Sequence, residues 1–457
     1  MKSKKIIFVV PDGTGIRNYL FSQIIPLLVQ EGHKFLLYHA LSEKAIKEIE
    51  NLYGFTIEHK SIPIYRETFF QKFFRESICF ARLLHNTKLE GNETILTNWK
   101  RNHGGIKQLF YKCAEFFGYY LHLKYPRILN AEKRYQKLLV DSLKPEKEFL
   151  SSYEPDVIFC THQRAVKAIP VFKAASELGI KTITAIYSWD NLVKARLAIR
   201  SNNYIVWSDY MKKELQRYYP EIKSNQILTT GTPQFCLYKR ANLLSKAKFF
   251  SLYDLDYDKF TICFSGDDEL TSPYDPRYLE DLAVCITEHN LDQKVQIIFR
   301  RCPVDISSRY DDVLKKYEVL ITPITPKWSN TDEDWTQLFP YFEDVDLLAN
   351  ICRYSDLVVN IGSTMAHDFT YFDNPAAFIN YDVTFDENWS VNTIYAYQHF
   401  RSMPTKDAVL WVNSPEDYIK IIRDLNQHKV VPGKDWFKRI NHEDMDSEKK
   451  IAKILVT

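Results

Sequence analysis

Polar side chains follow several apolar, strand-length runs of this 457-residue chain, at the points where the runs end. Three such loops carry Asp12, His162 and Asp190. A carboxylate or imidazole at the end of a strand can take a proton from a substrate hydroxyl near neutral pH. We therefore treat these three residues as candidate catalytic bases. Asp190 could instead hold an acceptor or orient His162, and each residue could equally be a loop residue that bonds its own backbone.

A second kind of site, suited to phosphate, is predicted at Gly362, Ser363 and Thr364. These residues separate the apolar run Leu357–Val359 from a helical pattern over 365–372. A turn of small residues before a helix exposes backbone N–H groups at the positive end of the helix dipole. Asp368, one turn into the helix, could accept hydrogen bonds from ribose hydroxyls. The alternative is an ordinary helix with Ser363 or Thr364 as its cap.

Further donor-side and acceptor-side candidates lie in the other loops that follow expected strands. A guanidinium offers a planar fork of donors with a fixed charge for phosphate, although an Arg pair after a strand can also be a solvated strand end. The donor-side candidates are Arg300, Arg301, Ser265, Gly266 and Thr232. The acceptor-side candidates are Gly13, Thr14, Arg17, Arg164, Trp189 and Asn191.

The elements that position these loops alternate between strand and helix in each half of the chain. Strands are expected over 6–10, 34–39, 156–160, 181–187, 203–207, 260–264, 295–299, 319–321, 357–359 and 376–380. Alternating strands and helices are typical of parallel sheets in an α/β fold, where ligands collect at the carboxyl ends of the strands. We predict a first domain over 1–240, a linker within 237–258, a second domain over 258–430 and a final segment over 431–457.

A helical insertion over about residues 62–145 differs from the rest of the first domain. Residues 60–144 contain sixteen Lys and Arg against seven Asp and Glu, an excess of nine positive charges, with aromatic pairs such as Phe69-Phe70 and Phe116-Phe117. Such a surface could meet an anionic lipid headgroup or a lipid-linked substrate. The alternative, which we favour for most of the aromatic residues, is an insertion whose aromatic side packs on its own domain.

The composition and the absence of several motifs exclude some classes of protein function. The net charge of +2 gives no overall nucleic-acid signal. The eight cysteines show no paired spacing, which indicates reduced thiols in the cytoplasm. No apolar run approaches the roughly 20 residues that span a bilayer, and the N-terminal run is too short for a signal peptide. We find no metal-ligand spacing, no complete dinucleotide or Walker motif and no nucleophile elbow, so we expect neither a metal nor a cofactor.

Together these stretches resemble the GT-B glycosyltransferases. The resemblance is carried by Gly13-Thr14-Gly15 before the first helix, Gly32-His33 at the second strand, Thr230 to Phe235 before the linker, Ser188 to Leu192, and Gly362 to Pro375. The last of these is most similar to bacterial surface-polysaccharide and glycerophosphate transferases, where the position of Asp368 is more often Glu. The sequence departs from the family at Arg300 to Pro303, where relatives often carry Arg-Pro-His-Pro, so the donor class stays open.

The resemblance implies two Rossmann-like domains that face a central cleft, with the last segment crossing back to the first domain. It implies a nucleotide-activated sugar as co-substrate on the second domain and a glycan or lipid-linked acceptor on the first. We expect a metal-independent, inverting glycosyltransferase in the cytoplasm, peripheral at the inner face of the membrane and without nucleic acid as a partner. Two alternatives stay open: a nucleotide-sugar epimerase on the same scaffold, and a non-catalytic nucleotide-sugar-binding or scaffold protein.

Overall fold

The computed structural model describes the whole chain except residues 1–2, 100–103, 141–142, 330–337, 429 and 443–445. The chain divides into two units. Unit 1 comprises Met1–Cys236, Tyr397–His399 and Ile440–Thr457, and unit 2 comprises Leu237–Ala396 and Phe400–Arg439. Within this division, the final segment of the chain belongs to the same unit as its first strand.

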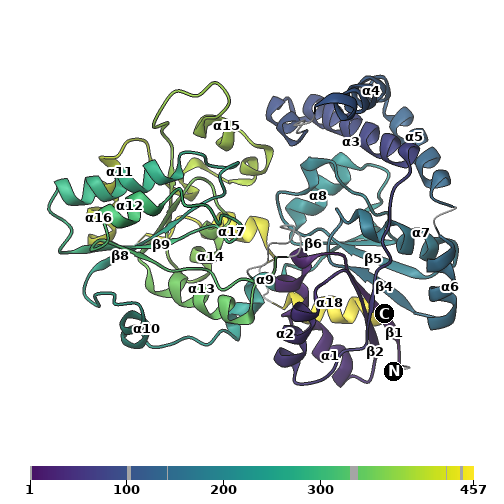
Figure 1. Cartoon of the computed structure of the whole chain (residues 1–457), viewed down its shortest axis with the longest axis horizontal. Coiled ribbons are helices and arrows are strands. Elements are labelled where there is room, and N and C mark those ends of the chain that lie inside the picture. The colour runs from purple at the N-terminus through teal and green to yellow at the C-terminus, as the bar shows by residue number, and fades with distance from the viewer. Residues whose placement is uncertain (1–2, 100–103, 141–142, 330–337, 429, 443–445) are drawn as a thin grey trace. The chain divides into compact units, whose positions relative to one another are not determined.

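Unit 1 is built on a seven-stranded parallel sheet with the order β3-β2-β1-β4-β5-β6-β7 (Figure 1). The order runs outward in both directions from the neighbours β1 and β4, as in doubly wound folds. The strands are β1 (Lys5–Val10), β2 (Lys34–His39), β3 (His59–Ser61), β4 (Val157–Cys160), β5 (Lys181–Ala185), β6 (Asn203–Val206) and β7 (Ile227–Thr229). The near-continuous apolar sequences of the central strands are explained by burial on both faces of the sheet, whereas the edge strand β3 is polar and exposed.

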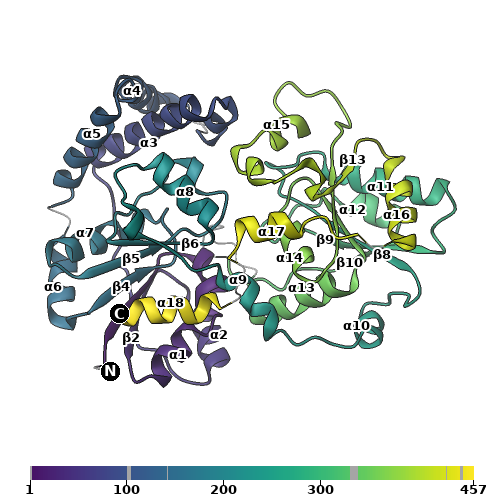
Figure 2. The same cartoon turned by 180° about the vertical axis from the view of Figure 1, so that it is seen from behind.

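Helices cover the sheet of unit 1, and one of them comes from the end of the chain. A core cluster that includes Ile7, Ile158 and Phe172 joins the sheet to α6 and α7. Figure 2 shows α18 beside α1, and the two helices are in contact. The helices are α1 (Ile24–Gln30), α2 (Glu43–Tyr53), α6 (Lys144–Tyr153), α7 (Ile169–Glu177), α8 (Asp209–Tyr218), α9 (Pro233–Cys236) and α18 (Ser447–Val456).

Three helices form the insertion between β3 and α6: α3 (Phe69–Glu90), α4 (Gly105–His122) and α5 (Tyr125–Leu138). They lie side by side in both views (Figures 1 and 2). The long helix α3 begins at a capping box between Thr68 and Gln71 and ends at Gly91, whose φ of 58° suits a left-handed helix cap. Within the described residues, no helix is long and apolar enough to cross a membrane.

Unit 2 repeats the same plan with a six-stranded parallel sheet in the order β10-β9-β8-β11-β12-β13. Here the order reverses between β8 and β11. The strands are β8 (Phe260–Ser265), β9 (Val295–Arg300), β10 (Ile321–Pro323), β11 (Leu357–Asn360), β12 (Ala376–Ile379) and β13 (Leu410–Val412). The helices are α10 (Lys246–Leu252), α11 (Asp275–Glu288), α12 (Asp311–Lys316), α13 (Phe342–Tyr354), α14 (Met365–Tyr371), α15 (Val391–Tyr395), α16 (Asp417–Gln427) and α17 (Lys434–Ile440).

The α/β class, the parallel sheets and the helical insertion agree with the sequence analysis. Three short strands, β3, β7 and β13, were not predicted because each has only three residues and none carries a continuous buried run. The helix expected directly after β1 is also different, because residues 13–20 form a 3-10 turn and a π-helical turn before α1 begins at Ile24.

Candidate functional site

The carboxyl ends of β1 and β4 bring Asp12 and His162 together. Nε2 of His162 lies 3.0 Å from Oδ2 of Asp12. The other carboxylate oxygen accepts a hydrogen bond of 3.0 Å from the backbone N–H of Thr14. Since β1 and β4 are the neighbours at which the sheet order reverses, this pair occupies the switch point where doubly wound sheets bind ligands.

The electrostatics of this pair assign a role to each nitrogen of the imidazole. Burial alone would raise the pKa of Asp12, but the hydrogen bond and charge of His162, together with Thr14, lower it below its usual value. An ionised Asp12 holds a proton on Nε2, which leaves Nδ1 as the basic nitrogen. The His162 side chain is 7% exposed, and no described residue hydrogen-bonds to Nδ1. The arrangement can therefore accept a proton at Nδ1.

The turn after β1 requires glycine because it lies against the end of β4. A Cβ atom on Gly15 would lie 2.4 Å from Oγ1 of Thr161, well inside van der Waals contact. Thr161 directly precedes His162, so this close approach sets the spacing between the two loops of the pair. Of the acceptor-side candidates in this turn, Gly13 is buried, while Thr14 and Arg17 are partly exposed.

Asp190, the third candidate base, is held by its neighbours. Its Oδ2 lies 2.5 Å from Nζ of Lys194, and its Oδ1 accepts a hydrogen bond of 2.8 Å from Nδ2 of Asn191. Burial raises the pKa of Asp190, but the charges of Lys194 and His399 and two hydrogen bonds lower it far below its usual value. Asp190 is bonded at both carboxylate oxygens, and its pKa is far below the usual value. It is therefore a poor proton acceptor. This geometry favours His162 over Asp190 as the base.

Two acceptor-side candidates beside Asp190 are buried in the same loop. Asn191 is 6% exposed, and its Oδ1 accepts a hydrogen bond of 3.2 Å from Gln163. Trp189 is 5% exposed and packs edge-on against the ring of His399 at 4.9 Å. Gln163, which the sequence analysis did not select, also accepts a hydrogen bond of 3.1 Å from the backbone N–H of Tyr187. These side chains brace the loops after β4 and β5.

Arg164 differs from these braces because it is exposed and has no ion-pair partner among the described residues. The carboxylates of Asp190 and Asp12 stabilise the positive charge of the Arg164 guanidinium. Arg164 also lines a cavity of about 740 Å³ between α3 and α5 of the insertion on one side and α7 with the loops after β4 and β5 on the other. Apolar side chains such as Ile78 and Val166 share this lining with further basic residues, among them Lys133, Lys137 and Arg196. A volume of this size is typical of small-molecule sites.

In unit 2, the predicted phosphate turn lies at the equivalent switch point, between β11 and α14. Gly362 has a φ of 71°, and a Cβ atom there would lie 2.5 Å from Cζ of Phe400. Asn360 accepts a hydrogen bond of 2.8 Å from the backbone N–H of Ser363. The amide of Ser363 is thus already bonded. Thr364, which is exposed, directly precedes the short helix α14 and offers the freer amide.

Asp368 lies on the inner side of α14 and is 2% exposed. Its Oδ1 accepts a hydrogen bond of 2.6 Å from the hydroxyl of Tyr238. The ribose-binding role predicted for Asp368 would need an oxygen that faces a ligand, and this contact disfavours that role. The helical spacing of the sequence placed Asp368 one turn from the phosphate turn but did not indicate which side of the helix it would occupy.

The two arginines at the end of β9 have different environments. Arg300 is 4% exposed, and its Nη2 lies 2.9 Å from both carboxylate oxygens of Asp344. Arg300 thus has its charge compensated inside unit 2, which disfavours it as a phosphate ligand. Arg301 is partly exposed and donates a hydrogen bond of 3.1 Å to the backbone oxygen of Ser307. The other N–H groups of the Arg301 guanidinium can donate hydrogen bonds to an anion.

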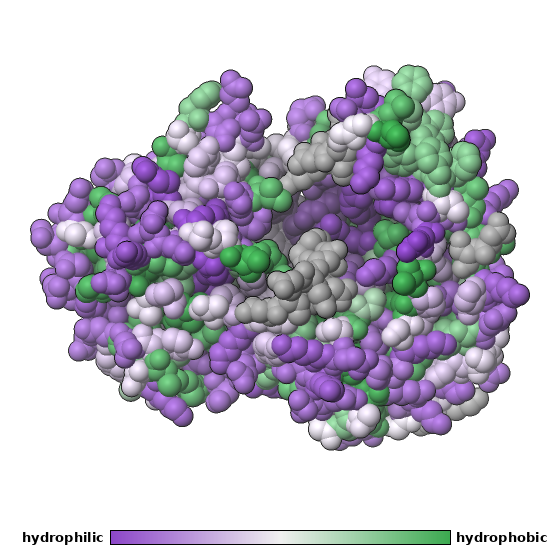
Figure 3. All heavy atoms as spheres, in the orientation of Figure 1, coloured by the Kyte–Doolittle hydropathy of each residue, from purple (hydrophilic) through white to green (hydrophobic). Residues whose placement is uncertain are grey.

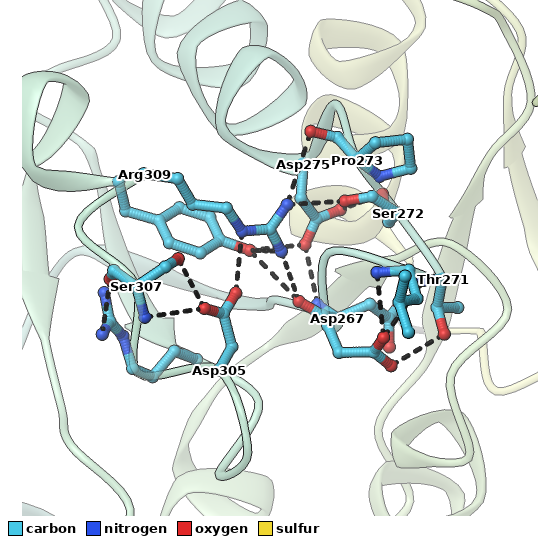
Figure 4. A network of polar contacts seen from close by, with 12 residues as sticks. Asp267, Thr271, Ser272, Pro273, Asp275, Asp305, Ser307 and Arg309 are labelled. Atoms are coloured by element: carbon cyan, nitrogen blue, oxygen red, sulfur yellow. Dashed lines mark hydrogen bonds and ion pairs between the residues drawn. The ribbon is translucent and has the colours of Figure 1, made fainter. Parts of the chain in front are cut away.

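The loop after β8 carries a network that the sequence analysis did not foresee (Figure 4). Arg309 lies 2.7 Å from Oδ2 of Asp305 and donates to the backbone oxygen of Asp267 at 2.5 Å. The backbone N–H of Asp267 donates to Asp275 at 2.7 Å. Burial raises the pKa of Asp267 well above its usual value, and the charges of Asp275 and Asp268 raise it further. Asp267 is therefore less acidic than an ordinary aspartate at this switch point.

The remaining donor-side candidates are enclosed by protein. Gly266 packs under this network, since a Cβ atom there would lie 2.8 Å from the hydroxyl of Tyr310. Ser265 is 5% exposed at the end of β8. Thr232 belongs to unit 1, is 1% exposed and donates its backbone N–H to Asn441 at 3.1 Å. A nucleotide-binding role for Thr232 is disfavoured because its polar groups face the protein. Among the described residues, no group of three or more His, Cys, Asp or Glu could hold a metal ion.

Comparisons with known proteins identify the fold. No protein-family profile matches the chain, and no curated protein sequence matches it. Solved structures do match over almost the full length. The UDP-GlcNAc 2-epimerase from Methanocaldococcus jannaschii is 13% identical, with a TM-score of 0.52 over 99% of both chains. A glycosyltransferase from Rickettsia africae ESF-5 is 11% identical, with a TM-score of 0.53 over 100% of both chains. The S. aureus MnaA–UDP co-structure is 9% identical, with a TM-score of 0.53 over 98% of this chain and 94% of the other.

The fold is therefore GT-B: two α/β units, each with a parallel sheet of doubly wound order. At such low identity the likeness defines the fold alone.

Proposed function

We propose that this protein is a glycosyltransferase that moves a sugar from a nucleotide-activated donor to a hydroxyl group of an acceptor, without a metal and with inversion. The observation that carries the proposal is the pair formed by Asp12 and His162 at the switch point of unit 1. An oriented imidazole with one free nitrogen is a suitable base for a hydroxyl nucleophile.

In this reaction the oxygen of the acceptor hydroxyl attacks the anomeric carbon of the donor sugar. The bond between that carbon and the phosphate oxygen breaks, and its electron pair leaves with the nucleoside diphosphate. The hydroxyl proton passes to Nδ1 of His162, while Asp12 stabilises the imidazolium through Nε2. One displacement with a base on the acceptor side inverts the anomeric centre.

The donor is assigned to unit 2, where the turn at Gly362–Thr364 and the loop after β8 lie on the neighbouring strands at which the sheet order reverses. The amide of Thr364 and the guanidinium of Arg301 are available to a departing diphosphate. Two of the similar structures are described with UDP or a UDP-sugar as ligand or substrate. A uridine nucleotide is therefore the first donor to test.

The acceptor is assigned to unit 1, in the cavity lined by Arg164. Its apolar lining, together with Arg164, Lys133 and Lys137, which form no ion pair with the described residues, fits an acceptor that combines an apolar part with an acidic group. A surface glycan precursor on a lipid carrier has this chemistry. We therefore expect the enzyme to work at the inner face of the cell membrane.

An epimerase on the same scaffold is the second candidate, favoured by Asp267, a carboxyl group of raised pKa at the switch point of unit 2. Incubation with a nucleotide sugar alone separates the two activities. An epimerised nucleotide sugar supports the epimerase, whereas release of nucleoside diphosphate that depends on an added acceptor supports the transferase. Tight donor binding with neither product would indicate a binding protein.

The donor class is tested first by thermal shift with UDP, GDP, CDP, CMP and dTDP, because a ligand that binds only the native state raises its melting temperature. We expect UDP to give the largest shift. The stabilising nucleotide then defines the sugar donors for the acceptor assay.

A further inference from the structure

One side of α4 exposes a continuous stripe of apolar side chains. Its members are three or four residues apart, so they project from the same side of the helix. Ile106 is 88% exposed and Phe116 is 82% exposed. The full stripe is Ile106, Leu109, Cys113, Phe116, Tyr120 and Leu123, all of which are exposed. A different side of α4, with Ala114, Gly118 and Leu121, is buried, so the fold uses only one of the two apolar sides.

The exposed surface continues onto α3. Phe69 is 64% exposed and Phe70 is 62% exposed. The ring of Phe69 meets the ring of Phe110 on α4 edge-on at 5.4 Å. We call the stripe of α4 together with Phe69 and Phe70 the docking face. Hydrophobic side chains gather over α3 and α4 in the upper right of Figure 3. An apolar surface of this extent is unusual for a part of a protein that meets only water.

Basic side chains accompany the docking face. Lys72 lies over the ring of Phe110 at 5.6 Å, and Arg127 lies over the ring of Tyr120 at 4.2 Å. Further exposed lysines on or beside α4 are Lys107, Lys112 and Lys124. Residues 105–127 contain a single acid, Glu115, and it accepts a hydrogen bond of 2.6 Å from Trp99. The face thus combines apolar groups with uncompensated positive charge.

We propose that the docking face binds the surface of an anionic phospholipid bilayer, with α4 lying in the plane of the interface. Aromatic and aliphatic side chains on one side of a helix enter the boundary between headgroups and acyl chains, while Lys and Arg beside them meet anionic headgroups. Charge decides between a bilayer and a second copy of this chain. Two copies that met through this face would bring their basic residues together, whereas anionic lipid neutralises them.

This inference does not depend on the proposed reaction, because binding to vesicles needs neither donor nor acceptor. Co-sedimentation with vesicles of phosphatidylcholine alone and of phosphatidylcholine with phosphatidylglycerol measures it directly. We expect binding to the anionic vesicles, at least tenfold weaker binding to the neutral ones, and loss of binding at high salt. Equal binding to both vesicles, or no binding to either, would overturn the proposal.

Matched variants locate the surface. Ile106→Ser with Phe116→Ser should weaken binding to anionic vesicles at least tenfold. Leu252→Ser with Val319→Ser, which changes side chains in unit 2 that are 60% and 92% exposed, should leave it unchanged. Wild-type protein that is dimeric without vesicles and becomes monomeric in the docking-face variant would assign the face to a second copy and refute the bilayer.

The unaltered chain offers a second readout if that variant does not fold. Of the eight cysteines, Cys113 is the exposed one, and it lies on the stripe. An environment-sensitive fluorophore on Cys113 should shift to shorter wavelength when anionic vesicles are added. An unchanged spectrum in the presence of bound vesicles would place the contact elsewhere and overturn the assignment.

Discussion

Nε2 of His162 lies 3.0 Å from Oδ2 of Asp12, although the two residues are 150 positions apart in the chain. The sequence between them contains the whole helical insertion, so this contact is made by the pairing of β1 with β4. The pair couples two residues that the sequence presented as separate candidates. In the proposed reaction, Asp12 orients the imidazole and His162 accepts the proton.

The first prediction concerns the base. His162→Ala should lower kcat for sugar transfer at least about 100-fold, because a positioned base contributes 10²-fold or more. Asp12→Asn should lower kcat about 10-fold to 100-fold, since it removes the charge that stabilises the imidazolium. His428→Ala, at an exposed histidine of unit 2, is the matched control and should leave kcat unchanged. Full activity in both His162→Ala and Asp12→Asn would refute the pair as the catalytic centre, whichever donor is used.

The second prediction separates the two arginines at the end of β9. Removal of one partner from a buried ion pair leaves an uncompensated charge, so Arg300→Ala should lower the free energy of unfolding by about 3–5 kcal/mol. Arg301→Ala should change it by less than about 1 kcal/mol but weaken nucleotide binding about tenfold. Chemical denaturation and calorimetric titration with the stabilising nucleotide measure the two effects. Weaker nucleotide binding in a stably folded Arg300→Ala, with none in Arg301→Ala, would reverse the assignment.

These residues show how far sequence reasoning extends. Asp12 and His162 could be selected because each lies two residues after an apolar run, and parallel strands place such residues at one edge of a sheet. The ion pair of Asp190 was also open to inference, since Lys194 stands four residues later. The burial of Asp368 was not, because its partner Tyr238 is 130 positions away. The burial of Arg300 could not be inferred either, because its partner Asp344 lies on α13, 44 positions away. The local sequence pattern predicts where a loop lies. Which of the loop's side chains can reach a ligand depends on tertiary contacts with residues far away in the sequence.

The third prediction concerns the acceptor. Arg164→Ala should raise KM for an acidic acceptor about tenfold and leave KM for the donor unchanged, because the side chain lines the cavity of unit 1 and has no ion pair with any described residue to lose. Initial rates with each substrate varied in turn give the two constants. Arg164→Lys should recover part of the loss if charge is what the acceptor needs. A rise in the donor KM instead would move Arg164 out of the acceptor site.

The fourth prediction is a pH dependence of stability in unit 1. Burial and the neighbouring His59 lower the pKa of His39 to about 4. Folded protein therefore keeps His39 neutral at pH values where the unfolded chain, with an ordinary pKa of about 6.5, binds a proton. Proton uptake by the unfolded state destabilises the fold as pH falls from about 6.5 to 4, by about 3 kcal/mol at this buried site. This stability is fully present above pH 6.5.

Urea denaturation at pH 7, 6, 5 and 4 measures that dependence, and His39→Gln provides the comparison because it cannot titrate. The difference between the wild-type protein and His39→Gln should shrink as pH falls. A constant difference over this range would show that His39 titrates normally in the folded protein.

The last prediction uses two glycines with almost the same backbone conformation. Gly362 has a φ of 71° and Gly179 a φ of 72°. A Cβ atom on Gly362 would lie 2.5 Å from Cζ of Phe400, whereas one on Gly179 would meet nothing within 4 Å. Gly179→Ala should therefore cost only the backbone strain, about 1 kcal/mol, and keep the nucleotide-dependent thermal shift. Gly362→Ala adds a steric conflict that must move the turn or the ring, so it should cost about 1–3 kcal/mol more and abolish the thermal shift. The backbone strain is the same in the two variants, so equal loss of nucleotide binding in both would indicate a general effect of destabilisation. A retained thermal shift in Gly362→Ala would exclude this turn as the site of the diphosphate.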